Sequence, residues 1–112
     1  MSTPYKLDYE WLRNDIDAVA TVELTVKGEG AREAILAWFE EVPLDELGTR
    51  GGGGWMVAEA TDIARTDADT VVLHITSGGE DVADGIQNGT ESAYEALEPF
   101  GVELSWKNLP RR

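Results

Sequence analysis

Residues 20–42 read ATVELTVKGEGAREAILAWFEEV, and this stretch decides the fold class. Together with Val19, its first eight residues form a segment, residues 19–27, where apolar and polar side chains alternate as in a half-buried strand. Gly28-Glu29-Gly30 ends the strand, and apolar residues recur at helical spacing through residues 31–42. The apolar stripe of this helix contains Ala31, Ala34, Ile35, Trp38, Phe39 and Val42. A strand followed by an amphipathic helix predicts a domain that mixes the two kinds of element.

The rest of the chain repeats these elements. Strands are predicted over residues 55–63 and 70–76, a helical region over residues 80–100 and a last strand over residues 102–106. The helical region is either one helix or two, because Asn88-Gly89 weakens its middle and Ser92 and Glu95 have capping-box spacing. Its predicted inward residues are Val82, Ile86, Ala93, Leu97 and Phe100. The order β-α-β-β-α-β over residues 19–107 predicts an α+β, ferredoxin-like fold, with two helices on one face of an antiparallel sheet.

Residues 1–18 form an extension to this core, and residues 108–112 form a tail of the same single domain, residues 1–112. Apolar residues alternate with polar ones over residues 5–11, which predicts an extra strand that pairs with residues 19–27 as a hairpin. A short helix over residues 8–13 is the alternative. Residues 44–54 include four consecutive glycines, Gly51 to Gly54, which predict a mobile loop.

Charge is the strongest compositional signal, with 22 acidic against 9 basic residues and a net charge of −13. This charge opposes direct binding to nucleic acid or to an anionic membrane, and it favours a basic protein partner. Two interpretations stay open, a solvated surface adapted to a salt-rich cytoplasm and a surface that recognises a basic protein. The candidate acidic patch comprises Glu40, Glu41, Asp45, Glu46, Glu80, Asp81 and Asp84.

The sequence lacks the residues that several kinds of catalytic and binding site need. The absence of cysteine argues against a disulfide scaffold and favours a cytoplasmic protein. The sequence has no basic apolar leader and no apolar run near the ~20 residues of a membrane span. His74 is the single histidine, no serine lies in a nucleophile motif, and neither glycine run completes a nucleotide-binding motif. We therefore expect no enzyme activity, no cofactor and no metal.

The open face of the predicted sheet is the candidate binding surface. Its expected members are Thr21, Glu23, Thr25, Trp55, Val57, Glu59, Val72, His74, Glu103 and Ser105. An exposed tryptophan among carboxylates is typical of a protein interface. Arg50 and Trp55 also flank the glycine run, which would let this loop close over a ligand. The alternative is that the first strand, a second subunit or a register one residue different hides Trp55 in a core.

The sequence thus supports a non-enzymatic acidic module that docks or blocks a basic protein, as immunity proteins, antitoxins and phage-encoded inhibitors do. A homodimeric sensor of a small ligand is the second hypothesis. A generic domain from a salt-adapted cytoplasm is the third. Fold class does not choose among them.

Overall fold

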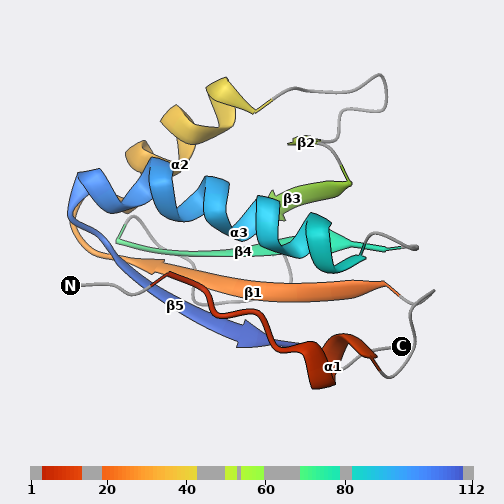
Figure 1. The fold of residues 1–112 in the computed structure, drawn as a ribbon. Coiled ribbons are helices and arrows are strands. Elements are labelled where there is room, and N and C mark those ends of the chain that lie inside the picture. The colour runs from red at the N-terminus through yellow and green to blue at the C-terminus, as the bar shows by residue number, and fades with distance from the viewer. Residues whose placement is uncertain are drawn as a thin grey trace.

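The computed structural model describes residues 4–13, 19–42, 50–52, 54–59, 69–78 and 82–109. The described chain is an α+β structure in which helices cover one face of an antiparallel sheet (Figure 1). The strands are β1 (Ala20–Lys27), β2 (Arg50–Gly52), β3 (Trp55–Glu59), β4 (Thr70–Ser77) and β5 (Glu103–Asn108). The helices are α1 (Tyr9–Arg13), α2 (Ala31–Glu41), α3 (Val82–Leu97) and the 3₁₀ turn η1 (Glu98–Phe100).

The sheet has the strand order β2-β3-β4-β1-β5, and each neighbouring pair is antiparallel. Its four main strands, β3, β4, β1 and β5, are compatible with the predicted ferredoxin-like fold. The short β2 adds to the edge at β3. None of the helices within the described ranges is both long and apolar enough to cross a membrane.

The main core lies between the sheet and the two long helices. Val22, Leu24 and Val26 of β1 are fully buried, as the alternation of this strand predicts. Their partners across the pair with β4 are Ile75, Leu73 and Val71, which are also fully buried. From α2 come Ala31, Ala34, Ile35 and Trp38, and from α3 come Ala93 and Leu97. The predicted apolar stripes of both helices therefore build the core.

Within residues 4–13 the structure has the short helix α1 and no strand, so the predicted strand over residues 5–11 is wrong and its helical alternative is confirmed. Asp8 caps this helix: its Oδ1 accepts hydrogen bonds from the backbone N–H of Glu10 at 3.1 Å and of Trp11 at 3.2 Å. An aspartate cap competes with an alternating pattern only seven residues long. Leu12 then packs into a second cluster, with Ala20, Val22, Val82 and Ile86.

Helix α3 is one continuous helix of 16 residues, which decides between the two alternatives for residues 80–100. Its glycines meet the sheet. A Cβ on Gly89 would lie 2.7 Å from Ile75 Cγ2, and a Cβ on Gly85 would collide with Ser77 Oγ and with the carbonyl oxygen of Gly54. The glycines that weaken the helix in isolation are therefore what lets it approach the sheet closely.

Two further predictions need correction. Phe100 does not point into the core: the helix ends at Leu97, and η1 leaves Phe100 52% exposed. The glycine run is not wholly a loop, because Gly51 and Gly52 belong to β2 and pair with Met56 and Trp55. Main-chain hydrogen bonds to a neighbouring strand fix a glycine backbone that has no preference of its own. Residues 43–49 and 53 lie outside the described residues.

Candidate binding groove

The sheet face away from the helices holds part of the predicted binding surface. Thr21, Glu23 and Thr25 of β1 lie opposite Thr76, His74 and Val72 of β4, and Ser105 and Glu103 of β5 lie opposite Thr25 and Lys27. Because side chains alternate along a strand, all of these residues face away from the buried positions Val22, Leu24 and Val26. The structure therefore brings these predicted residues together.

Trp55 and Val57 do not belong to that face, which corrects their predicted position. The register pairs them with Ser77 and Ile75, which lie on the side covered by the helices, and Val57 is 3% exposed. Met56 takes the open position instead. The cause is a shift of one residue: WMVAE has apolar residues on both faces, so its pattern does not choose between them.

Six of the predicted binding and acidic residues lie wholly or partly outside the described residues. Glu59 pairs with Leu73 through its backbone and Arg50 with Val57, while the side chains of both lie outside the described residues. Asp45, Glu46, Glu80 and Asp81 lie outside them entirely. The predicted acidic patch is therefore testable in this structure only through Glu40, Glu41 and Asp84.

The open sheet face carries charges of both signs. His74 Nε2 lies 3.2 Å from Glu23 Oε2, and Lys107 lies opposite Glu23 on the other side. Lys27 lies opposite Glu103 in the same way. An acidic residue thus has a basic or imidazole neighbour in each of these rows. The described part of this face therefore carries a mixed charge.

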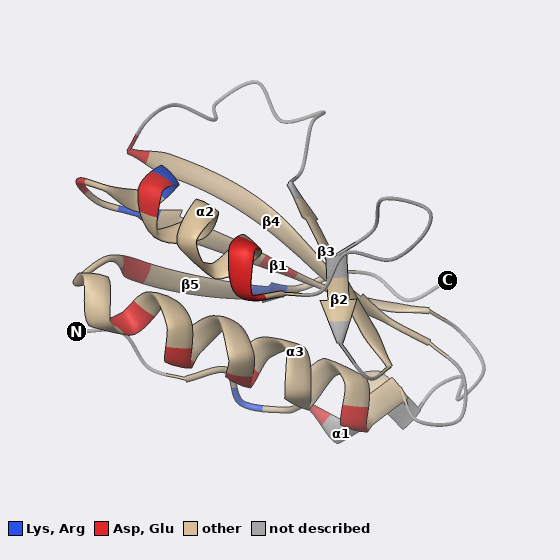
Figure 2. Cartoon of the chain, turned by 90° about the horizontal axis from the view of Figure 1, so that it is seen from above, with Lys and Arg blue, Asp and Glu red and all other residues tan. Residues whose placement is uncertain are grey.

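The acidic side of the described structure is the helical layer (Figure 2). Helices α2 and α3 carry Glu33, Glu40, Glu41, Asp84, Glu91 and Glu95 against a single basic residue, Arg32. The helices lie over one face of the sheet, so these carboxylates belong to one side of the molecule. The described members of the predicted acidic patch are part of this layer.

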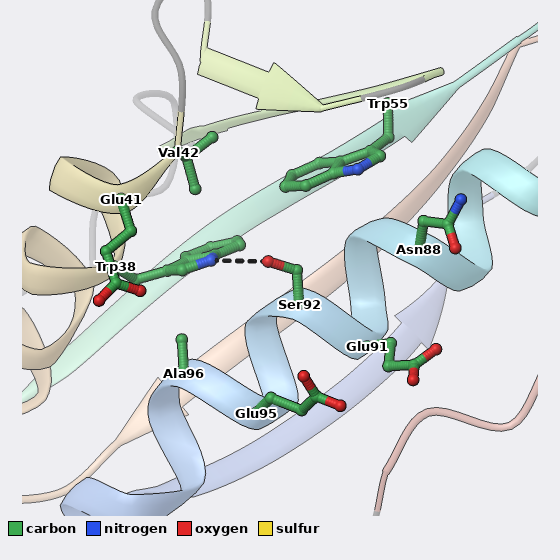
Figure 3. A pocket seen from close by; sticks show the side chains of 9 residues that line it. All are labelled: Trp38, Glu41, Val42, Trp55, Asn88, Glu91, Ser92, Glu95 and Ala96. Atoms are coloured by element: carbon green, nitrogen blue, oxygen red, sulfur yellow. Dashed lines mark hydrogen bonds between the residues drawn. The ribbon is translucent and has the colours of Figure 1, made fainter.

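A cavity of about 500 Å³ opens in this layer, between α2, α3 and the start of β3 (Figure 3). We call it the tryptophan groove. It is lined by Trp38, Glu41, Val42, Trp55, Asn88, Glu91, Ser92, Glu95 and Ala96. Helix α2 and its C-terminal end supply Trp38, Glu41 and Val42, and α3 supplies five of the nine residues.

Two parallel indoles form the inner wall of the groove. The rings of Trp38 and Trp55 are 9° from parallel, with centroids 6.1 Å apart. Trp38 is only 2% exposed, and its Nε1 donates a hydrogen bond to Ser92 Oγ at 3.0 Å, which joins α2 to α3. Trp55 is half-buried. The absence of a side chain at Gly89 leaves room for the Trp55 ring, whose Cδ2 would lie 3.0 Å from a Cβ there.

Three carboxylates lie along the rim of the groove. Glu91 and Glu95 lie one turn apart on α3, and Glu41 lies across the groove on the last turn of α2. All three residues are exposed, and no lysine or arginine of the described chain forms an ion pair with them. An aromatic wall beside exposed carboxylates is suited to a cationic group, because the indole face and the carboxylates both attract positive charge.

The sequence pattern does not predict this groove. Its pattern places Trp38 in the core stripe, and Ser92 and Glu95 at a possible helix start. The usable signal is the pair Gly85 and Gly89, spaced one turn apart, which indicates a helix face that approaches another element closely. That spacing does not show on which face of its strand Trp55 lies, so it does not predict that Trp55 belongs to the groove.

A second hollow of about 590 Å³ lies on the other side of α3, against residues 4–7. Glu91 and Glu95 line it too, together with Tyr5 and Tyr94. The Tyr5 hydroxyl donates a hydrogen bond to Asn108 Oδ1 at 2.6 Å, and its ring meets Trp106 edge-on at 5.6 Å. Burial, followed by the nearby Asp8 carboxylate, raises the pKa of Tyr5 to about 12.

Within the described ranges no three His, Asp or Glu side chains gather closely enough to hold a metal ion. Comparison of the chain with protein-family models, with curated proteins and with solved structures finds no match.

Proposed function

We propose that this protein is a non-enzymatic binding module that docks onto a basic protein through its helical layer. The observation that carries the proposal is the tryptophan groove, whose lining combines Trp55 with Glu41, Glu91 and Glu95. The proposal keeps the acidic partner-blocking module expected from the composition, and it moves the interface from the open sheet face to the opposite side.

The arrangement has the two properties of a protein interface. Half-buried tryptophan supplies a large contact area at low cost in side-chain entropy, and tryptophan is enriched among the residues that dominate binding. The surrounding carboxylates supply complementarity to a basic partner and accelerate its association. A chain with net charge −13 attracts such a partner from a distance, and the groove gives it a defined place to bind.

The strand order supports a ferredoxin-like assignment for the domain that presents this surface. In that arrangement the helical layer is held by a sheet whose strands are far apart in the sequence. The positions of α2 and α3 relative to each other, and therefore the groove, are fixed by tertiary packing. A rigid groove avoids part of the ordering cost of binding.

A pair of charge variants tests the proposal. Glu91→Gln/Glu95→Gln removes two carboxylates from the groove, and Glu29→Gln/Glu103→Gln removes two exposed carboxylates elsewhere. The probe is a fluorescein-labelled peptide in which lysine and arginine alternate with glycine, followed by anisotropy. We expect the groove variant to bind about tenfold more weakly than the parent, and the control less than about twofold more weakly.

Both variants change the net charge equally, so a general attraction between polyions predicts equal losses. Equal weakening by the two variants would therefore overturn the proposed site. A titration from low to high salt should weaken binding of the parent in both circumstances, because the charges are exposed. Only the difference between the variants reports on the groove.

A further inference from the structure

We infer that the second hollow, between residues 4–7 and α3, is a binding site for a small organic cation that has an apolar body and an ammonium group. The hollow lies across α3 from the tryptophan groove, so this site goes beyond the proposed docking function. The inference depends on three properties of the hollow: its size, its apolar floor, and the carboxylates on its rim.

The second hollow has the size of a small-molecule site. One wall is the segment of residues 4–7, which runs alongside α3 (Figure 1, Figure 2). The other wall is a face of α3, whose lining residues follow each other at helical spacing from Gln87 to Glu95. The volume of about 590 Å³ falls within the range of about 300–1,000 Å³ that is usual for ligand pockets.

The floor of the hollow is apolar. Tyr5, Leu7 and Tyr94 are half-buried, and Thr90 is 3% exposed. Tyr5 and Leu7 pack against the smaller core cluster, while Tyr94 packs against the main one. The Thr90 hydroxyl donates a hydrogen bond to the carbonyl oxygen of Ile86 at 2.7 Å, so it is satisfied within the helix. Such a floor favours the apolar body of a ligand.

The rim of the hollow carries more negative than positive charge. Glu91, Glu95 and Lys6 are exposed, and Lys6 is the one basic residue among the nine described residues of the lining. Figure 3 shows the Glu91 carboxylate on the side of α3 away from Trp55, which is the side of this hollow. An ammonium group donates strong, charge-assisted hydrogen bonds to carboxylates. The net charge of −13 also attracts cations to the molecule.

The wall formed by residues 4–7 is held in place by β5. The Tyr5 hydroxyl binds Asn108 Oδ1 at 2.6 Å, and the Tyr5 ring meets Trp106 edge-on. These contacts fix the segment before any ligand arrives. A site with a fixed wall loses little conformational freedom on binding, which favours a defined place for a small ligand.

The experiment compares three probes: phenethylamine, which has both an apolar body and an ammonium group, neutral 2-phenylethanol, and ethylamine, which lacks the ring. Binding is measured by NMR titration, with the ring resonances of Tyr5 and Tyr94 as reporters. We expect saturable binding of phenethylamine with a dissociation constant of about 1 mM, and binding of the other two at least about fivefold weaker. The indole resonances of Trp38 and Trp55 report on the tryptophan groove and should stay unchanged.

Two pairs of variants test the charges on the rim. Glu91→Gln removes a carboxylate from the hollow, and Glu29→Gln removes an exposed carboxylate elsewhere. Lys6→Gln removes the lysine of the hollow, and Lys27→Gln removes an exposed lysine elsewhere. We expect Glu91→Gln to bind phenethylamine about threefold more weakly and Lys6→Gln about twofold more tightly, while each control stays close to the parent. All four positions are exposed, so the variants should keep the thermal stability of the parent.

Three results would overturn the inference. The first is the absence of a saturable shift of Tyr5 and Tyr94 with phenethylamine, and the second is equal binding of 2-phenylethanol. The third is a shift confined to Trp38 and Trp55, which would place the probe in the tryptophan groove. None of these results touches the proposed docking function, which the basic peptide and its own charge variants test.

Discussion

At the scale of single residues, Tyr5 shows how the N-terminal segment is tied to the rest of the molecule. Its hydroxyl reaches Asn108 at the end of β5, 103 positions away in the sequence, and its ring packs on Trp106. Burial of the phenol disfavours its ionised form, and the Asp8 carboxylate adds to this effect, so the pKa of Tyr5 rises to about 12.

This shift predicts a loss of stability at alkaline pH. The unfolded chain releases the Tyr5 proton near pH 10, whereas the folded chain keeps it until about pH 12. The stabilisation is therefore complete below pH 10 and disappears as the pH rises to 12. We expect the parent to lose about 1 kcal/mol more than Tyr5→Phe between pH 9 and 12, after allowance for solvent screening of a half-exposed group.

The measurement is urea unfolding of both proteins at a series of pH values, with tyrosinate absorbance recorded in parallel. Tyr5→Phe removes the titrating group and keeps the ring against Trp106, so it is the matched control. Parallel curves for the two proteins up to pH 12 would mean that Tyr5 titrates normally in the folded chain.

At the scale of elements, the contact of α3 with the sheet governs the groove. Gly85 and Gly89 let the helix approach β3 and β4, and this approach places the Trp55 ring against Gly89 in the groove. A glycine inside a helix lowers the stability of the helix by about 1 kcal/mol relative to alanine. Two glycines in α3 therefore indicate that packing requires them. Here the reason is contact with Ser77, Ile75 and Trp55.

Gly85→Ala is therefore predicted to destabilise the protein despite its gain in helix propensity. The added methyl would collide with Ser77 Oγ and with a backbone carbonyl, and overpacking of this kind costs about 1–3 kcal/mol. Gln87→Ala, at an exposed position of the same helix, should stay within about 0.5 kcal/mol of the parent. Thermal and urea unfolding of the two variants decide the matter, and a Gly85→Ala protein more stable than the parent would contradict the close approach.

At the scale of the whole molecule, charge is distributed unevenly between the two faces of the sheet. The helical layer is acidic, and the open face has acids and bases opposite each other. Repulsion within the acidic layer opposes folding, and added salt shortens its range from about 30 Å at 0.01 M to about 3 Å at 1 M. The two buried clusters are apolar and do not depend on salt for their contacts.

We therefore expect a cooperative unfolding transition even at low salt, with a melting temperature that rises by about 5 °C when potassium chloride is increased to molar concentration. Circular dichroism across the salt series, together with mass from light scattering, checks this expectation. If the chain folds only in molar salt, its acidic residues are an adaptation to a salt-rich solvent. The proposed docking function would then lose the argument from net charge.

The sequence alone determined those elements whose hydrophobic pattern allows only one buried face. The strict alternation of residues 20–26 and the stripe of residues 31–42 each allow a single buried face, so β1, α2 and their core residues follow from local chemistry. The tertiary structure decided the segments whose local pattern fits two buried faces or two kinds of element. Residues 55–59 are apolar on both faces, and only pairing with β4 sends Trp55 toward the helices. Residues 5–11 fit both periods, and the Asp8 cap selects the helix. The tryptophan groove belongs to the second kind: its residues come from three elements, and only the packing of α3 on the sheet brings them together.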